Sequence, residues 1–521
     1  MTQASLLTPA LCAGIGLALA SAPAAAQCQG HTRNGAAHDW FGWSAANAGD
    51  VDADGYADFI AGAPQSALYG SAAAGYAVVV SGRRGLELHR LTGTIPGGAF
   101  GEAVAGAGDV NADGFADLIV GAPRTSTGGE ATVFSGADAA PLHHITGSAG
   151  GYTGASVAGA GDLDRDGFDD FLVGSPAEFG PFGYGGAVRA YSGRDGTLLW
   201  ETGSPGYRDY FGSSLDGLGD VNGDGWPDVI VGASGTNLPV VNAGAAYVLS
   251  GRDATTLYTL RGYELDDLLG TAVTGAGDIN QDGLADFAVA APQAFGVGAV
   301  QVYSGQTGQT MLFLHSPATR LARAGDHDGD GRPDLIAGNP AAEAGFPFAG
   351  SAVVYSGWTG AVLRSFQGSS AQMWLGCAVA GLGDLDGDGS SELLVGAYGD
   401  DRAGPEAGSV TVYSCDDFVL SGPFPGLAGA GNTLIVNGAT PFQPVVFAFG
   451  TQLGSTGVPG CGILSLNIRP VQRAQVVDAD ASGTAALPFF VPASKSGTAA
   501  LFQVAELGAC RVSNLVAHVF P

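Results

Sequence analysis

The sequence predicts an all-β fold: a seven-bladed β-propeller followed by a small C-terminal β-sandwich-like domain. Two observations carry this prediction. An acidic nine-residue pattern recurs at a mean spacing of about 56 residues, starting at Asp50, Asp109, Asp162, Asp220, Asp278, Asp326 and Asp384. Between its copies lie short strand-like segments bounded by Gly, Pro and Asp, with no stretch of helical period. Self-similarity at such a period indicates a repeat architecture, in which stacked units share one core.

Each repeat contains four strand-like segments in a fixed order. An Ala- and Gly-rich segment such as 100–109 precedes the acidic loop, and a segment ending in Gly-Ala-Pro, such as 118–123, follows it. The third segment begins at glycine and alternates, as in 298–305, and the fourth is variable, as in 196–203. Four strands per unit are typical of a propeller blade. The small residues of the first segment are expected because innermost strands crowd around the central channel.

The two ends of the chain differ from the repeats. Residues 1–26 combine an apolar core with a small-residue cleavage site, which predicts a secretory signal peptide, although no Lys or Arg precedes the core; an N-terminal anchor is the alternative. The propeller is expected over 27–421. Residues 422–521 lack acidic loops and carry strand-like runs at a spacing that predicts the β-sandwich-like domain. No other apolar run is long enough for a membrane span.

The charge balance limits the partners. The net charge is −29, with 20 Lys and Arg against 49 Asp and Glu. A nucleic-acid-binding surface needs cations to neutralise phosphates, and an anionic membrane attracts basic segments, so neither partner is expected. With export predicted, the expected location is secreted or at the cell surface.

The acidic loops are the candidate metal sites. Each places side-chain oxygens at positions 1, 3, 5 and 9, has glycine at position 6, and offers the carbonyl of position 7, which together suit the six to eight oxygen ligands of Ca²⁺. Up to seven Ca²⁺ ions are expected. The candidate ligands, loop by loop, are Asp50, Asp52, Asp54, Tyr56 and Asp58; Asp109, Asn111, Asp113, Phe115 and Asp117; Asp162, Asp164, Asp166, Phe168 and Asp170; Asp220, Asn222, Asp224, Trp226 and Asp228; Asp278, Asn280, Asp282, Leu284 and Asp286; Asp326, Asp328, Asp330, Arg332 and Asp334; and Asp384, Asp386, Asp388, Ser390 and Glu392.

Other interpretations of these loops are less favoured. A single copy would be an ordinary Asp-Gly turn with Asx capping, but seven copies with the same oxygen spacing favour a metal. Mg²⁺ demands a smaller octahedral shell, and Zn²⁺ prefers Cys and His ligands. Asn at position 3 removes one charge, so the second, fourth and fifth loops should bind Ca²⁺ more weakly. The loops are expected to be structural, each fastening one blade.

The repeats resemble the FG-GAP repeats of integrin α-subunit propellers, here in a chain of the secreted bacterial type. The Phe-Gly half stands at Phe41-Gly42, Phe100-Gly101 and Phe211-Gly212, and the Gly-Ala-Pro half at 62–64 and 121–123. The sixth repeat departs most, with Pro317-Ala318 in place of Phe-Gly. The resemblance covers about residues 38–415. It implies seven blades with a calcium loop between the first and second strands of each.

The resemblance also implies how the ring closes, with the N-terminal segment as the outer strand of the last blade. A Cys28–Cys415 disulfide would then join the two ends of the ring; the alternative is that 418–421 completes the blade. Cys377, on an inner strand, is expected to be a buried free thiol, and Cys461 can pair with Cys510.

The ligand-binding face is expected opposite the calcium loops. Its connections carry aromatic residues, namely Tyr69, Phe179, Phe182, Tyr184, Tyr207, Tyr210, Tyr263, Phe295, Phe346, Phe348 and Trp374. Loops on a rigid scaffold commonly bind ligands, although such aromatics often only pack their own loops. By resemblance, the leading interpretation is an adhesion or protein-interaction module with an extracellular protein ligand. A calcium-dependent lectin with a glycan ligand is the alternative.

Catalysis is not expected. The sequence has neither a Gly-x-Ser-x-Gly elbow nor a His-Glu-x-x-His helix. His143-His144 is predicted on an outer strand, where exposure explains it. A polysaccharide-acting enzyme remains the third option.

Overall fold

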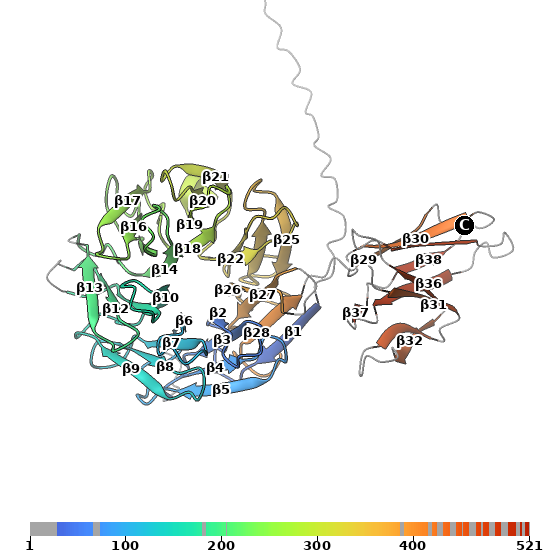
Figure 1. Ribbon diagram of the computed structural model, residues 1–521, viewed down its shortest axis with the longest axis horizontal. Helices are drawn as coiled ribbons and strands as arrows, with labels where there is room; N and C mark the ends of the chain where they lie inside the picture. Colours follow the sequence, from blue (N-terminus) through green and yellow to red (C-terminus); the bar gives the residue numbers. More distant parts are fainter. Residues whose placement is uncertain are drawn as a thin grey trace, which may run out of the picture.

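Seven four-stranded antiparallel sheets form a ring in the computed structural model (Figure 1). The structure describes residues 29–65, 73–179, 184–204, 206–385, 390–414 and 419–424, and beyond these the strands β30–β38. The innermost strands of neighbouring blades contact one another all the way round, including the first and the last. The predicted seven-bladed propeller is therefore confirmed.

The strands of blades one to six run outward in sequence order, as expected, and so do the first three strands of blade seven. The innermost strands are β2 (Ser44–Gly49), β6 (Ala103–Gly108), β10 (Ser156–Gly161), β14 (Ser214–Gly219), β18 (Ala272–Gly277), β22 (Arg320–Gly325) and β26 (Leu375–Gly383). The second strands are β3 (Asp58–Ala63), β7 (Asp117–Ala122), β11 (Asp170–Ser175), β15 (Asp228–Ala233), β19 (Asp286–Ala291), β23 (Asp334–Asn339) and β27 (Glu392–Ala397).

The outer half of each blade completes the sheet. The third strands are β4 (Tyr76–Val80), β8 (Glu130–Phe134), β12 (Ala187–Tyr191), β16 (Ala245–Ser250), β20 (Ala299–Tyr303), β24 (Ser351–Tyr355) and β28 (Ser409–Ser414). The outermost strands of blades one to six are β5 (Glu87–Thr92), β9 (Pro141–Thr146), β13 (Leu198–Gly203), β17 (Thr256–Arg261), β21 (Thr310–Leu314) and β25 (Val362–Gln367). A short 3₁₀ turn, η2 (Ala294–Gly296), lies before β20.

The ring closes through the N-terminal segment. Strand β1 (Gln29–Asn34) is the outermost strand of blade seven and pairs antiparallel with β28, with Gln29 opposite Ser414. This confirms the expected closure. The alternative, completion by 418–421, is wrong, because β1 occupies that edge and β29 (Val419–Phe424) pairs with β30 (Gly431–Asn437). Cys28 and Cys415 lie outside the described residues.

The core lies between the blades. The second strands are buried along almost their whole length, as in the wholly buried run Asp58–Ala63, because each blade is covered by a neighbour on both faces. Large apolar residues such as Phe171 and Phe287 are fully buried there. The outermost strands instead alternate between half-buried and exposed residues, since one side faces solvent.

Glycine is required where innermost strands meet. A Cβ atom at Gly159 would lie 2.8 Å from the carbonyl oxygen of Gly106 in the preceding blade, and one at Gly217 would lie 2.7 Å from that of Gly159. Neighbouring backbones are therefore too close for a side chain at this level. The expected crowding of the innermost strands is confirmed.

The two halves of the repeat motif form the joint between blades. Within a blade, Gly154 N–H donates to the carbonyl of Gly174 at 3.0 Å. Between blades, a Cβ atom at Gly121 would lie 2.0 Å from the carbonyl oxygen of Gly154. The Phe-Gly glycine of one blade thus packs against the Gly-Ala-Pro glycine of the preceding one.

Blade six keeps this joint in a modified form. Thr319 N–H donates to the carbonyl of Gly338 at 2.9 Å, which is the bond that the Phe-Gly glycine makes elsewhere. By strand register Pro317-Ala318 keeps the Phe-Gly position, since Arg320 pairs with Gly338 as Ala103 pairs with Gly121, and only the hydrogen-bond donor is shifted, to Thr319. The facing residue of blade five is Ala290, not glycine.

The C-terminal region is also all-β. Beyond β29 and β30, its strands are β31 (Pro444–Gly450), β32 (Gln452–Gly457), β33 (Ser465–Arg469), β34 (Arg473–Asp478), β35 (Ala485–Phe490), β36 (Ala499–Glu506), β37 (Arg511–Val512) and β38 (Val516–Val519). They form the sheets β29-β30-β35 and β34-β31-β36-β37, with β38 on β36, and the hairpin β32-β33. Val445 and Phe447 are buried. The expected domain boundary after residue 421 falls inside β29 and stays a prediction.

Among the described residues, no helix has the length and apolar character that crossing a membrane requires. Residues 1–26, Cys461 and Cys510 lie outside the described part of the chain, so the signal peptide and the Cys461–Cys510 pair stay predictions.

Candidate functional site

Each acidic loop connects the innermost strand of a blade to the second strand. Position 1 follows the last residue of the innermost strand, and position 9 is the first residue of the second strand, as with Asp50 after β2 and Asp58 at the start of β3. Because every blade has the same strand order, all seven loops emerge at the same face of the ring. This agrees with the expected arrangement.

Inside a loop the carboxylates cap backbone N–H groups. In the first loop, Asp50 accepts hydrogen bonds from the N–H groups of Asp54 (3.0 Å) and Gly55 (2.8 Å), and Asp54 accepts one from Tyr56 (3.1 Å). The second, third and fifth loops repeat these bonds. Asx turns are therefore present, and the carboxylate oxygens keep further lone pairs for a cation.

The residue at position 9 is buried in every blade. Asp58, for example, accepts hydrogen bonds from Val51 N–H (2.7 Å) and from Gly82 N–H (3.0 Å), so it joins the acidic loop to the end of the third strand. Burial in a low-dielectric environment raises the pKa of Asp58 to about 6 and that of Asp170 to about 7. Among the described residues, neither Asp58 nor Asp170 forms an ion pair with a basic side chain.

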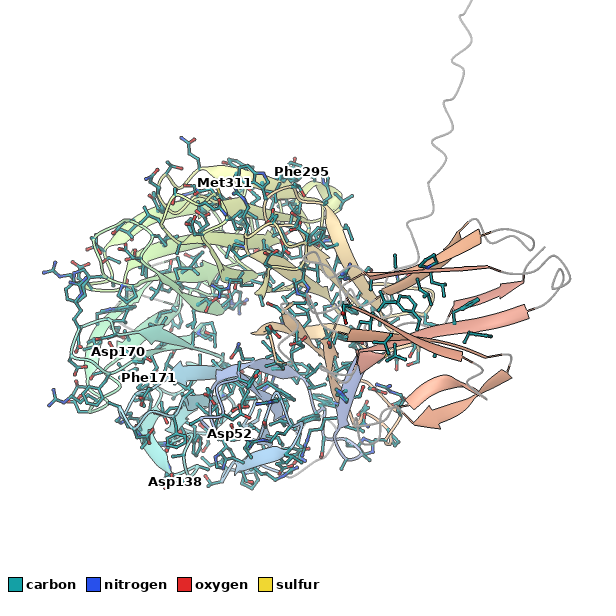
Figure 2. All side chains as sticks on the ribbon, turned by 45° about the vertical axis from the view of Figure 1, so that its right-hand side comes forward. Asp52, Asp138, Asp170, Phe171, Phe295 and Met311 are labelled. Carbon is teal, nitrogen blue, oxygen red and sulfur yellow. The ribbon has the colours of Figure 1, made fainter. Side chains whose placement is uncertain are left out.

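In the described part of the chain, three loops bring three carboxylates together. The groups are Asp50, Asp52 and Asp58; Asp162, Asp164 and Asp170; and Asp326, Asp328 and Asp334, with one oxygen of each residue within 4.8 Å of the others in its group. Figure 2 labels Asp52 of the first group and Asp170 of the second. All-oxygen, acidic donor sets of this kind fit a hard divalent cation. These clusters can therefore hold metal ions.

The other predicted ligands do not belong to these three carboxylate groups. Position 5 contributes no carboxylate to these groups. The second, fourth and fifth loops have Asn at position 3, so they offer an amide oxygen in place of a carboxylate at that position. In the seventh loop, Asp386 and Asp388 lie outside the described residues, whereas Asp384, Ser390 and the buried Glu392 are described. Glu392 accepts a hydrogen bond from Leu385 N–H at 2.5 Å, as position 9 does elsewhere.

The structure adds loop features that the sequence analysis missed. Position 4 has a positive φ angle in the described loops, at Ala53 (55°), Ala112 (57°), Arg165 (63°) and Gln281 (60°) as well as at glycines. An arginine also reaches the first loop: Arg84 lies 3.0 Å from Asp52 and 3.2 Å from Asp54. The residue types at position 4 differ between loops, so the sequence pattern could not predict the positive φ angle there. The contact of Arg84 could not be predicted either, because Arg84 is distant in sequence from Asp52 and Asp54.

Position 7 carries a second repeated contact. Arg83 lies over Tyr56, Arg194 over Phe168 and Arg252 over Trp226, with 4.4, 5.6 and 5.3 Å between guanidinium carbon and ring centre. In the sixth blade the two partners are exchanged, because Arg332 at position 7 lies over Trp358 at 4.0 Å. The contact is thus kept when its residue types are swapped.

A pocket of about 360 Å³ lies on the face opposite the loops, where blades seven, one and two meet. Its aromatic lining consists of Trp40, Trp43, Trp374 and Tyr398. Trp40 and Trp43 stack at 5.6 Å between ring centres, and Trp374 stacks on Tyr398 at 5.7 Å. The sequence analysis singled out only Trp374. Trp40 occupies the matching position directly before Phe-Gly, which is the signal that would have found it.

Charged residues also line this pocket. Arg124 binds both oxygens of Glu102, at 2.7 and 3.1 Å, so that pair is neutral. Glu406 accepts a hydrogen bond from the Trp40 indole at 3.3 Å, and Asp401 is exposed at the rim. The pocket therefore combines flat apolar rings with hydrogen-bond acceptors.

The other predicted aromatics are spread over the same face. Phe179 stacks on Tyr184 at 4.0 Å, and both side chains are more than half exposed. Phe348 stacks on Trp374 at 4.7 Å beside the pocket. Tyr263 is 75% exposed, which makes it the most exposed aromatic of the described residues. Tyr69 and Phe182 lie outside the described residues.

Two further predictions concern single residues. Cys377 is a buried free thiol, as expected; its thiol donates to the carbonyl of Gly42 at 3.0 Å, and burial raises its pKa to about 11. His143 and His144 have separate partners, since His143 donates to the Gly193 carbonyl while His144 contacts Thr132. They form no joint catalytic pair.

Comparison with known proteins identifies the repeat. The family model of the FG-GAP repeat matches residues 41–80, 100–134, 153–191, 211–249, 269–303 and 378–413. Each match begins at or near the Phe-Gly position and ends in or next to the third strand. The sixth blade, with its altered Phe-Gly position, is not among the matched segments.

Integrin alpha chains are among the similar curated proteins. Integrin alpha-5 of Xenopus laevis is 34% identical over 239 residues, which are 40% of this chain and 22% of that protein. Integrin alpha-V of Gallus gallus is 32% identical over 39% of this chain and 21% of its own length. Integrin alpha-IIb of Homo sapiens is 37% identical over 29% of this chain and 16% of its own. The chain thus spans about a fifth of the length of these relatives.

A solved quinohemoprotein alcohol dehydrogenase from Pseudomonas putida aligns over 68% of this chain and 65% of that chain, with a TM-score of 0.37 and 11% identity. This likeness is too remote to bear on function.

The fold and its loops define a seven-bladed propeller with one acidic loop per blade and a glycine joint that recurs between most blades. More particularly, six of its seven blades match the FG-GAP repeat, and the chain is similar in this region to integrin alpha chains.

Proposed function

We propose that this chain is an exported, calcium-binding propeller that acts as an extracellular adhesion or protein-interaction module. One observation carries the proposal: the acidic loops and the aromatic pocket lie on opposite faces of the ring. Ions held in the loops would stabilise the scaffold, while the other face stays available to a ligand. The integrin alpha chains among its relatives support the adhesive role.

Calcium is the proposed ion. The carboxylates at positions 1, 3 and 9 would hold it in the first, third and sixth loops, with position 5, the position-7 carbonyl and the Asn-containing loops as further candidates. Bound Ca²⁺ would supply positive charge beside buried carboxylates whose pKa is raised. A site with a Kd of about 10 μM in about 1 mM calcium would stabilise the fold by about 2.7 kcal/mol.

A glycan is the second candidate ligand. The observation in its favour is the pocket of Trp40, Trp43, Trp374 and Tyr398, because aromatic rings stack against the apolar faces of sugars and nearby carboxylates accept hydrogen bonds from hydroxyl groups. A binding role is preferred to catalysis, because the clear carboxylate groups belong to the loops and the two adjacent histidines have separate partners.

A paired binding experiment tests both candidates. The full chain in 1 mM calcium is applied to a glycan array and used to capture proteins from surface extracts. Trp374→Ala should abolish the interaction, because Trp374 lines the pocket, whereas Tyr263→Ala, a matched exposed aromatic elsewhere on the face, should not. A defined protein captured through Trp374 supports the adhesion module, and saturable sugar binding through Trp374 supports the lectin. Binding that Trp374→Ala leaves intact contradicts the pocket.

A further inference from the structure

The fourth acidic loop contains an Asn-Gly step that the other asparagine-containing loops lack. Position 3 is an asparagine in three loops, at Asn111, Asn222 and Asn280. The residue that follows is Ala112 in the second loop and Gln281 in the fifth, whereas Asn222 is followed by Gly223. Because glycine has no Cβ atom, its backbone nitrogen is open to the side chain of the preceding residue. The fourth loop therefore differs from the other two in a residue that affects the chemistry of its asparagine.

The side chain of Asn222 and the backbone nitrogen of Gly223 are held close by covalent bonds. A new bond between Cγ of Asn222 and this nitrogen would close a five-membered ring, so the two atoms are within reach of one another without any further contact. Reaction within one chain also raises the effective concentration of the attacking group. Both residues are exposed, so water reaches them.

A carboxylate touches the nitrogen that would attack. Gly223 N–H donates to Oδ1 of Asp220 at 2.6 Å. In the second and fifth loops the same oxygen at position 1 accepts instead from the N–H of position 5, at 3.0 Å in both. The sixth loop also has glycine at position 4 and repeats the bond of the fourth, from Gly329 to Asp326 at 2.8 Å. In the fourth loop the carboxylate of Asp220 is thus placed to take the proton of Gly223 N–H during an attack.

The amide that would be attacked is held on both sides by Asp224. The N–H of Asp224 donates to Oδ1 of Asn222 at 2.8 Å, and Nδ2 of Asn222 donates to a carboxylate oxygen of Asp224 at 3.2 Å. The N–H donor stabilises the negative charge that develops on the carbonyl oxygen during attack. The second loop has the same two bonds at Asn111, both at 2.9 Å. What distinguishes the fourth loop is therefore the glycine together with the position of the Asp220 carboxylate.

We propose that Asn222 is a deamidation site, at which the fourth loop replaces its amide by a carboxylate. The Gly223 nitrogen bonds to Cγ of Asn222, the Cγ–Nδ2 bond breaks, and the amide nitrogen leaves as ammonia with the proton that Asp220 takes from Gly223 N–H. Water then opens the ring. Attack of water at Cγ leaves aspartate, and attack at the backbone carbonyl carbon leaves isoaspartate. The sequence of steps consumes water alone and releases ammonia alone.

The consequence for the ion rests on the proposed function. Aspartate at position 3 would give the fourth loop the four side-chain carboxylates of the first, third and sixth loops, so this product should bind Ca²⁺ more tightly. Isoaspartate lengthens the backbone by one methylene group and displaces its carboxylate, so this product should bind more weakly. Calcium held by Asp220 and Asn222 would occupy the oxygens used in the reaction, so a filled loop should deamidate more slowly than an empty one.

Incubation of the full chain in EDTA at neutral pH, followed by peptide mass spectrometry, tests the site. Asn222 should lose its amide about tenfold or more faster than Asn111 and Asn280, because only at Asn222 is the attacking nitrogen both unhindered and in contact with a carboxylate. Another Asn-Gly step, Asn34-Gly35, is the internal control. Its Gly35 N–H donates to the Gly408 carbonyl at 3.0 Å in the closing blade, so Asn34 should also react slowly.

Two variants separate the contributions of the glycine and the carboxylate. Gly223→Ala should reduce the rate at position 222 to that of the other loop asparagines. Alanine already occupies position 4 with a positive φ angle at Ala53 and Ala112, and a Cβ atom at Gly223 would lie 3.6 Å from the nearest listed neighbour atom, on Leu284, so this variant should fold. Asp220→Asn should slow the reaction severalfold. The melting temperature of each variant shows whether it is folded.

Three results would overturn the proposal: an intact Asn222 after Asn111 and Asn280 have reacted, equal rates at all three, or an unchanged rate in Gly223→Ala. An unchanged rate in folded Asp220→Asn would contradict the role of the carboxylate. Excess calcium in place of EDTA should slow the loss at Asn222. If the amide is lost in EDTA and calcium has no effect, the deamidation site stands and calcium binding by this loop fails.

Discussion

At the scale of single residues, the acidic loops combine strict and permissive positions. Gly114 at position 6 has a φ angle of 89°, and Ala112 at position 4 has one of 57°. The left-handed conformation costs a non-glycine residue about 1–2 kcal/mol, yet Ala, Arg and Gln occupy position 4. The N–H of position 5 donates to the side-chain oxygens of positions 1 and 3, and these hydrogen bonds hold the loop in this shape and offset the cost.

Arg84 should weaken calcium binding by the first loop. Its guanidinium lies beside Asp52 and Asp54, where it already supplies positive charge. Because Arg84 is half exposed, solvent screens the interaction, so Arg84→Gln should tighten the first site by a factor of about two to five. Calcium titration followed by calorimetry measures this. Arg83→Gln is the control, since Arg83 lies over Tyr56. Equal effects of both variants would contradict the assignment.

At the scale of elements, neighbouring loops are joined in two ways. In the second, third and fifth loops the N–H of position 8 donates to the position-1 carbonyl of the preceding loop, as from Ala116 to Asp50 (3.0 Å) and from Ala285 to Asp220 (3.1 Å). Pro227 and Pro333 stand at position 8 of the fourth and sixth loops and cannot donate. At those two junctions an arginine connects the loops: Arg165 donates to Gly225, and Arg332 to the Ile279 carbonyl.

Loss of such an arginine should loosen one junction. Arg165 also lies over Trp226 at 4.1 Å, so Arg165→Ala removes a hydrogen bond and a cation–π contact and should lower the free energy of unfolding by about 1–2 kcal/mol. Denaturant unfolding in EDTA measures it. Arg194→Ala is the matched control, because Arg194 lies over Phe168 and beside Asp166 of its own blade and is 62% exposed. A larger effect of the control would refute the junction.

The closing blade offers a second test at this scale. The β1–β28 register places Gln29 opposite Ser414, and Cys28 and Cys415 are the next residues along the chain. We propose that these two cysteines form a disulfide, which would constrain a loop of nearly 390 residues. Non-reducing peptide mapping should find the pair, and Cys28→Ser should lower the melting temperature only under oxidising conditions. Pairing of Cys28 with another cysteine would contradict it.

At the scale of the whole molecule, stability should depend on calcium and on pH together. Asp58, Asp117, Asp228 and Asp334 have a pKa of about 6, and Asp170 of about 7, because burial disfavours their charged form. The folded chain therefore binds more protons than the unfolded chain between about pH 4 and pH 7. Their contribution to stability is present below about pH 4 and is lost as the pH rises through 6 to 7.

Thermal unfolding checks this dependence. In EDTA, the melting temperature should fall as the pH rises from 4.5 to 7.5, and 1 mM calcium should restore it at pH 7.5 by tens of degrees if several loops are filled. Magnesium at the same concentration should restore it less, because Mg²⁺ gives up its water reluctantly. A melting temperature at pH 7.5 that EDTA leaves unchanged would argue against calcium in the loops.

The sequence by itself determined the repeat number, the strand order within a blade and the positions of the acidic loops. These depend on local patterns: alternation, turn glycines and oxygen spacing recur in each blade. It also located Cys377 on an inner strand. Tertiary structure decided what depends on residues from different blades, because curvature of the ring brings distant segments together. Trp40 meets Tyr398 only because the ring closes, and Arg165 reaches Gly225 only because the loops are neighbours.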